Sequence, residues 1–231
     1  MLELIDVHTY YGESHILHGV SLIVKAGTVT CLLGRNGAGK TTLINSVIGL
    51  TPPRQGKVMF KGRDITGLPE YKIAREGIGL VPQGRRIFKR LTVLENLQVA
   101  CESNEDLNRN LQTIYSYFPV LLDRSKSKGG QLSGGEQQML AIARVLLLNP
   151  ALLLMDEPSE GLAPMIVENI GTIIKRLAET ELSILLVEQN LSQAFNIAHY
   201  IYVISNGRIV HESPPELVID NDQLKAQYLG V

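Results

Sequence analysis

One stretch of nine residues carries the clearest chemistry in the sequence: Gly34-Arg35-Asn36-Gly37-Ala38-Gly39-Lys40-Thr41-Thr42. It matches G-x-x-x-x-G-K-[ST], the pattern of a phosphate-binding loop. Glycines permit backbone angles that side chains forbid, so successive N–H groups can turn inward around an anion. We therefore expect this stretch to cradle the phosphates of a nucleotide. Lys40 would reach the β- and γ-phosphates, and the hydroxyl of Thr41 would hold Mg²⁺.

Three further polar side chains follow two predicted strands. Asp156 and Glu157 come directly after the apolar run 151–155, and Gln83 follows the run 78–81. An acid at the end of a buried strand beside a phosphate loop suits Mg²⁺, and we assign that role to Asp156. Glu157 would then orient or deprotonate the water that attacks the γ-phosphate, and Gln83 would touch Mg²⁺ or that water. The alternatives are acids that end a strand at the surface and a glutamine in a plain loop.

A second anion-binding candidate is Leu132-Ser133-Gly134-Gly135-Glu136. Ser133 is a good N-cap for the helix predicted over residues 136–148. Gly134 and Gly135 would expose backbone N–H groups at the positive end of that helix. A plain capped helix is the alternative, and it explains the serine but not both glycines.

The elements around these residues predict how they are positioned. Val29–Leu33 predicts a buried strand before the glycine loop, and residues 43–48 predict a helix after it. Strands that alternate with helices along the chain imply an α/β fold with a mostly parallel sheet and ligands at the carboxyl ends of its strands. Residues 2–7, 20–24 and 57–61 predict a small antiparallel sheet, with Tyr10-Tyr11-Gly12 as a turn.

The chain divides by composition into a core and an insertion. Residues 84–150 carry helix formers and few strand signals. In residues 1–83 and 151–231, predicted strands alternate with predicted helices. We therefore predict one domain, with an α/β core and a helical insertion that contains Ser133.

The overall composition excludes several classes of protein. The 231 residues are 45% hydrophobic and 19% charged, which indicates a globular chain. Lys and Arg number 22 against 23 acidic residues, so no basic excess predicts a nucleic-acid partner. The two cysteines are far apart and predict neither a disulfide framework nor a metal site. The longest apolar runs have the length of strands, so we expect a soluble, intracellular protein.

Together these motifs resemble the ATP-binding cassette (ABC) ATPases over essentially the whole chain. Residues 132–136 are similar to the L-S-G-G-Q signature of that family, with Glu136 in place of glutamine. The order of the glycine loop, Gln83, the signature and the Asp156-Glu157 pair also fits. Tyr11 matches the aromatic residue that stacks on adenine. The resemblance implies a single ABC nucleotide-binding domain with a P-loop NTPase core, ATP as substrate and Mg²⁺ as cofactor.

The resemblance also implies a site shared between two subunits. In this family two cassettes pair head to tail, as a homo- or heterodimer, with each ATP between the phosphate loop of one and the signature of the other. Ser133, Gly134 and Gly135 would then meet the γ-phosphate of an ATP bound by the second subunit. ATP closes the dimer, and hydrolysis reopens it.

A second residue departs from the family pattern. The family places a histidine after the strand that follows the Asp-Glu pair, where it contacts the γ-phosphate, and the matching residue here is Gln189. Glutamine can donate a hydrogen bond to phosphate but carries no positive charge. We expect the protein to hydrolyse ATP despite this replacement, with Glu157 acting on the attacking water.

Short sequence motifs indicate which subfamily the chain resembles. Glu188-Gln189-Asn190 and residues 157–164 resemble the smaller ATPase subunit of branched-chain amino acid importers, and residues 12–21 also resemble the related urea-importer ATPases. This implies transmembrane permease partners, indirectly a solute-binding protein, and a peripheral position at the inner face of the cell membrane. The alternatives are a soluble cassette acting on nucleic acid or ribosomes and a weakly hydrolysing regulatory cassette. The chain has neither the second cassette, the sustained heptads nor the basic patch expected of the soluble class.

Overall fold

A six-stranded sheet forms the centre of the computed structural model, which describes residues 1–101 and 103–230. Its strand order is β10-β9-β3-β8-β7-β6. Neighbouring strands run parallel except β10, which pairs antiparallel with β9. The strands are β3 (Val29–Leu33), β6 (Ile78–Val81), β7 (Leu152–Asp156), β8 (Ser183–Glu188), β9 (Tyr200–Ser205) and β10 (Arg208–Ser213).

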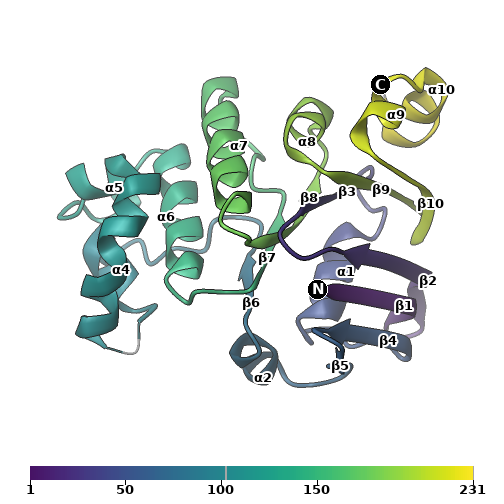
Figure 1. Cartoon of the computed structure of the whole chain (residues 1–231), viewed down its shortest axis with the longest axis horizontal. Helices are drawn as coiled ribbons and strands as arrows, with labels where there is room; N and C mark the ends of the chain where they lie inside the picture. Colours follow the sequence, from purple (N-terminus) through teal and green to yellow (C-terminus); the bar gives the residue numbers. More distant parts are fainter. Residues whose placement is uncertain (102, 231) are drawn as a thin grey trace.

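A second sheet of four antiparallel strands lies beside the first and contains the N-terminus (Figure 1). Its order is β2-β1-β4-β5. The strands are β1 (Leu2–Tyr11), β2 (Ser14–Val24), β4 (Gln55–Phe60) and β5 (Arg63–Asp64).

Helices cover both faces of the parallel sheet (Figure 1). The helix α1 (Lys40–Val47) lies between the two sheets, and the other helices, apart from α2, pack on the opposite face or beside it. The helices other than α1 are α2 (Glu70–Arg75), α3 (Val93–Gln98), α4 (Asn104–Tyr117), α5 (Pro119–Asp123), α6 (Gly134–Leu146), α7 (Pro164–Ala178), α8 (Leu191–Ile197), α9 (Pro215–Ile219) and α10 (Asp222–Leu224). A 3₁₀ turn at Gly129–Gln131 precedes α6, and a π turn at Lys225–Leu229 follows α10. None of the helices in the described residues has the length and apolar composition needed to cross a bilayer.

The two faces of the sheet hold two separate hydrophobic cores. Successive side chains of a strand point to opposite faces, so in β3 Cys31 joins the core under α6 and α7, whereas Leu32 joins the core around α1. In β7, Leu153 and Leu154 divide in the same way. Because both faces are covered, the parallel strands are mostly apolar.

The predicted α/β fold is confirmed, with a parallel core sheet and a separate antiparallel sheet. One expectation was wrong: β2 begins at Ser14 rather than at residue 20, because β1 continues through Tyr11 and pairs Tyr11 with Ser14. Pro119 opens α5 at the first helical position. Proline suits that position because the N–H it lacks has no partner inside the helix.

Candidate active site

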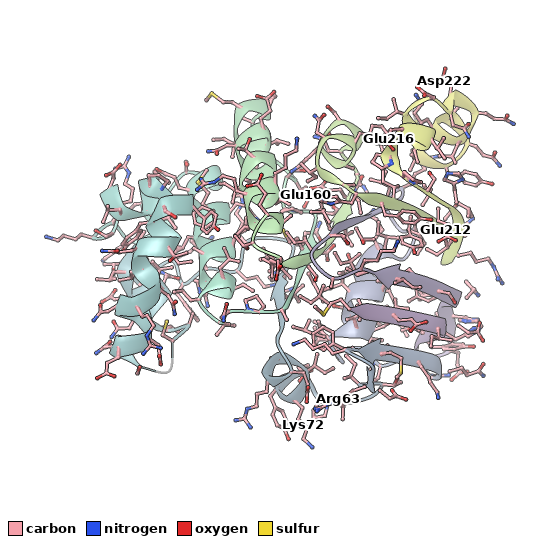
Figure 2. All side chains as sticks on the ribbon, viewed as in Figure 1. Arg63, Lys72, Glu160, Glu212, Glu216 and Asp222 are labelled. Carbon is pink, nitrogen blue, oxygen red and sulfur yellow. The ribbon has the colours of Figure 1, made fainter. Side chains whose placement is uncertain are left out.

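The site is built where four parallel strands end. In the order β3-β8-β7-β6 these strands are followed by the glycine loop, Gln189, Glu157 and Gln83. Carboxyl ends of parallel strands meet at one edge of a sheet, so residues from positions 34 to 189 converge there. Figure 2 labels Glu160 close to this edge, on the segment between β7 and α7.

The glycine loop leads straight into α1. Gly39 caps this helix with a φ of 110°, a conformation that favours glycine, and no side chain bonds the first helical N–H groups. These groups are free to face an anion. Lys40, the first residue of α1, is only 4% exposed, and its Nζ donates to the carbonyl oxygens of Gly34 at 2.8 Å and Arg35 at 3.1 Å. The helix therefore begins inside the motif, three residues earlier than predicted.

Thr41 and Asp156 bring two oxygen ligands together. The hydroxyl of Thr41 lies 3.4 Å from Oδ1 of Asp156 and donates toward it. Burial raises the pKa of the Asp156 carboxyl, and the nearby Glu157 carboxylate adds to this effect, while the Thr41 hydrogen bond opposes it. A hydroxyl and a carboxylate are the donors that Mg²⁺ prefers, so these two residues fit a magnesium ion.

Glu157 is the centre of the polar network. Its Oε1 lies 3.1 Å from Nζ of Lys40 and accepts a hydrogen bond of 2.8 Å from the amide of Gln189. Its Oε2 lies 3.5 Å from the amide nitrogen of Gln83, which also donates to Glu160 at 2.8 Å. Glu157 is the first residue after β7 and has a φ of 48°, an uncommon angle for a side-chain-bearing residue.

Gln189 links this network to the glycine loop. Its amide nitrogen donates to Oδ1 of Asn36 as well as to Glu157. Gln189, which replaces the family histidine, therefore still contacts both the glycine loop and the predicted catalytic residue Glu157.

Tyr11 lies at the end of β1, on the side of α1. Its ring is 47% exposed, and Nδ2 of Asn45 on α1 donates to its hydroxyl at 3.4 Å. An exposed ring held beside the loop helix has the geometry needed to stack on a base.

The Ser133 segment forms the start of α6. Ser133 caps the helix, and its own N–H donates to Oε2 of Glu136 at 2.7 Å, which completes a capping box. Glu136 also lies 3.5 Å from Arg124. Either glutamate or glutamine can take this capping role, so the departure at Glu136 preserves the helix start.

The two glycines of this segment lie against other elements. A Cβ on Gly135 would meet the side chain of Ile166 on α7 at 2.7 Å, and a Cβ on Gly134 would meet the guanidinium of Arg85 at 3.0 Å. Within the described residues, no hydrogen bond or ion pair joins Ser133, Gly134 or Gly135 to the glycine loop. The fold of a single chain thus brings the glycine loop together with Gln83, Asp156, Glu157 and Gln189, but not with the Ser133 segment.

Sequence reasoning missed the role of Glu188. This side chain is 2% exposed and accepts the N–H groups of Ser159 at 3.2 Å, Gln189 at 3.1 Å and Asn190 at 3.3 Å. Burial raises the pKa of its carboxyl, and these hydrogen bonds oppose the rise. It therefore ties the loop after β7 to the loop after β8. An acid that ends an entirely apolar strand was the only signal available.

Comparison with known proteins decides the family. Residues 17–160, more than half of the chain, match the family model described as ABC transporter. The chain belongs to the ABC transporter family. The predicted resemblance is confirmed, and the chain is an ATPase cassette of this family.

Two curated relatives match this cassette along most of its length. It is 43% identical over 232 residues, with all of both chains covered, to the high-affinity branched-chain amino acid transport ATP-binding protein BraG of Pseudomonas aeruginosa. It is 37% identical over 225 residues to the lipopolysaccharide export system ATP-binding protein LptB of Haemophilus influenzae, covering 95% of this chain and 93% of that one.

Solved structures of cassettes share the fold. The ADP conformation of an ATP-binding cassette of an ABC transporter matches with a TM-score of 0.90 and 29% identity, covering 98% of this chain and 97% of that one. A dimeric post-hydrolysis cassette bound to ADP and Pi matches with a TM-score of 0.82 and 28% identity, covering 93% and 99%.

Proposed function

We propose that this cassette hydrolyses ATP to drive import of branched-chain amino acids across the cell membrane. The observation that carries this proposal is the 43% identity to BraG over the full length of both chains. The polar network around Glu157 supports hydrolysis as the activity. With no spanning helix in the described residues, the cassette would act from the inner face of the membrane, docked on permease subunits.

The glycine loop would hold ATP. Backbone N–H groups of residues 34–42 and the N-terminus of α1 would face the phosphates. Lys40 would exchange its bonds to the Gly34 and Arg35 carbonyls for bonds to phosphate oxygens, which carry full charge and accept more strongly. Tyr11 would stack on the adenine from the antiparallel sheet.

Thr41 and Asp156 would hold Mg²⁺, with Gln83 from the end of β6 as a further contact. A bound Mg²⁺ neutralises charge that develops on the phosphates during transfer. Burial raises the pKa of Asp156, and a cation bound there would oppose this effect by stabilising the ionised carboxylate.

Glu157 would orient the attacking water or take its proton. Its bonds to Gln189 and its approach to Gln83 fix the carboxylate in front of the glycine loop. The amide of Gln189 would then turn from Asn36 to the γ-phosphate and donate to it, in the place of the family histidine. Because an amide does not titrate, this contact would persist over the pH range of the assay.

A second subunit would complete each site. Ser133, Gly134 and Gly135 are separated from the loop of their own chain, and a similar cassette has been solved as a dimer with ADP and Pi. In the proposed dimer these residues would face the γ-phosphate bound by the other subunit. The second subunit would be an identical or a related cassette, and the solute-binding protein would act only through the permease.

Two other transported substrates are alternatives to branched-chain amino acids. Residues 12–21 resemble urea-importer ATPases, and the 37% identity to LptB favours lipopolysaccharide export as a second candidate. A tagged chain purified from membranes in mild detergent, with partners identified by mass spectrometry, separates these functions. We expect permeases and a solute-binding protein whose complex, in proteoliposomes, hydrolyses ATP faster with leucine than with urea. Capture of an export complex, or of ribosomes, would contradict the proposal, and the Glu157→Gln chain is the control for hydrolysis.

A further inference from the structure

Three histidines gather on one face of the β1–β2 hairpin, away from α1 and the glycine loop. The register pairs His8 with His18 and Tyr10 with His15, and a bulge between these pairs keeps all four side chains on the same face. The opposite face, with Thr9 bonded to Ser46 of α1, points into the protein. The proposed mechanism uses none of these histidines.

The side chains of His8 and His15 are close enough to share one ligand. Nδ1 of His8 lies 3.1 Å from Nε2 of His15. A zinc ion binds imidazole nitrogens at about 2.0–2.1 Å, which sets two such nitrogens about 2.9 Å apart at a right angle and about 3.4 Å apart at the tetrahedral angle. The observed separation lies between these values, so an ion fits between the rings with little movement.

The second nitrogen of His8 has the partner that metal-binding histidines use. Its Nε2 lies 3.3 Å from Oδ1 of Asp6. Metal-bound histidines almost always donate their other N–H to a carboxylate, a carbonyl or water, which fixes the tautomer and raises the basicity of the ligating nitrogen. A carboxylate only accepts, so a neutral His8 carries its proton on Nε2 and presents a bare lone pair at Nδ1.

We propose that His8 and His15 form a binding site for one divalent transition-metal ion such as Zn²⁺ or Ni²⁺, with Asp6 orienting His8. On binding, the proton that His15 shares with His8 moves from Nε2 to Nδ1 of His15, so both facing lone pairs go to the metal and no net proton is released. The described residues contain no group of three or more His, Cys, Asp or Glu side chains arranged around one point, so solvent completes the coordination. Imidazole ligands favour Zn²⁺, Ni²⁺ and Cu²⁺ over Mg²⁺, which separates this site from the one at Asp156.

The surroundings hold His15 in place. Its ring stacks on Tyr10 with centroids 4.1 Å apart, and the ring of His18 lies 3.9 Å away on another side. The side chain of His8 is 22% exposed, which leaves a path for an ion from solvent.

Metal binding would join β1 to β2 near the tip of the hairpin. The His8–His15 contact lies next to the Tyr11–Ser14 pair that ends the hairpin. An ion there resists separation of the two strands, and the free energy of binding adds to the stability of the folded chain. This inference does not depend on the transported solute or on hydrolysis.

Titration calorimetry of the full chain with ZnCl₂ and with NiCl₂, without nucleotide or Mg²⁺, tests the site. We expect one ion per chain, no measurable binding at this stoichiometry in His8→Ala and His15→Ala, and unchanged binding in His211→Ala. His211 is a matched control because it lies on β10 and bonds Ser213 instead. Asp6→Asn should weaken binding about 10- to 100-fold, as loss of a partner to a metal-bound histidine does.

A second measurement identifies the ligands directly. Electron paramagnetic resonance of the Cu²⁺-loaded chain should show two imidazole nitrogens, reduced to one or none in His15→Ala, while circular dichroism checks that each variant is folded. Equal metal binding by the wild type and both histidine variants would overturn the proposal, as would no saturable binding by the wild type up to 1 mM metal. Unchanged affinity in Asp6→Asn would overturn the role given to Asp6.

Discussion

The Nζ atom of Lys40 lies 3.1 Å from Oε1 of Glu157, with the two side chains only 4% and 8% exposed. These are the residues to which we assign the γ-phosphate and the attacking water. Removing one partner of a buried ion pair is costly, because the charge of the other partner is then left uncompensated. Lys40 keeps two carbonyl partners and Glu157 keeps Gln189, so each side chain has other contacts when they separate.

Glu157→Gln should abolish turnover while ATP still binds. Loss of a positioned general base costs about 10²- to 10⁴-fold in rate. The glutamine has the same shape and leaves Lys40 bonded to the Gly34 and Arg35 carbonyls. Phosphate release measures the rate, and a fluorescent nucleotide analogue measures binding. Glu160→Gln is the control, since Glu160 contacts Gln83 but not Lys40. An equal loss of rate in both variants would move the catalytic role away from Glu157.

Gln189 should support hydrolysis without a histidine. Gln189→Ala removes the donor to Asn36 and to Glu157. We expect the rate to fall by at most about 10-fold, the contribution of one ordinary hydrogen bond, with ATP affinity nearly unchanged. Gln189→His should remain active and gain a pH dependence between about pH 6 and 7, where imidazole titrates. The rate–pH profiles of the three proteins provide the check. An inactive wild type that Gln189→His alone restores would mark a degenerate cassette.

Gly135→Ala should destabilise the chain through Ile166. The added Cβ would meet Cγ2 of Ile166 at 2.7 Å, and overpacking of this kind costs about 1–3 kcal/mol. Denaturant unfolding of Gly135→Ala, Ile166→Ala and the double variant measures the coupling between the two positions. We expect the double variant to recover most of the loss caused by Gly135→Ala. Additive effects would show that α6 and α7 shift apart instead.

The convergence of the site could be predicted from sequence because it depends on local patterns. The glycine loop is contiguous, and Asp156, Glu157 and Gln189 each follow an apolar strand directly. Parallel strands place such residues at one edge. The resemblance to ABC cassettes supplied the role of Ser133, which its position in one chain does not reveal.

Other features required the folded chain. Glu188 accepts N–H groups from Ser159, which is 29 positions earlier, as well as from its own loop. The Lys40–Glu157 pair likewise depends on the order of strands in the sheet, where β8 alone separates β3, which precedes Lys40, from β7, which precedes Glu157. The contact between His8 and His15 also required the folded chain, because it depends on the bulged register of β1 and β2.

Stability should depend on pH through Asp156, with a definite sign. Its pKa in the folded chain is raised above 3.8, chiefly by burial. The folded state therefore binds the proton more tightly than the unfolded state, and stability falls as pH rises from 3.8 through the folded pKa. Asp156→Asn removes this loss. The free energy of unfolding of the variant, minus that of the wild type, should grow from pH 4 to pH 7 in buffer with EDTA.

Asp64 provides a control of opposite sign. Hydrogen bonds from Thr66 lower the pKa of this exposed carboxyl. The free energy of unfolding of Asp64→Asn, minus that of the wild type, should therefore fall as pH rises toward 3.8. It should stay constant from pH 5 to 7. A difference for Asp156→Asn that also stays flat would contradict the burial argument.

Ser133→Arg should separate ATP binding from hydrolysis. Arginine removes the cap of α6, which costs about 0.5–2 kcal/mol, and places a bulky cation where the second subunit presents its γ-phosphate. Within the described residues no hydrogen bond or ion pair joins Ser133 to the glycine loop of the same chain, so the isolated subunit should bind ATP as tightly as the wild type. Turnover should fall to background, and size-exclusion chromatography with ATP should show no dimer.

A mixed dimer sharpens this test. Ser133→Arg combined with a Lys40→Ala partner leaves one composite site with both defects and one with neither, whereas either variant alone leaves two defective sites. We therefore expect each mixed dimer to recover about half of the wild-type turnover if the two sites act independently. A 1:1 mixture of randomly pairing subunits, in which about half of the dimers are mixed, should then recover about a quarter. Loss of ATP binding by the isolated Ser133→Arg subunit would instead place Ser133 in the site of its own chain.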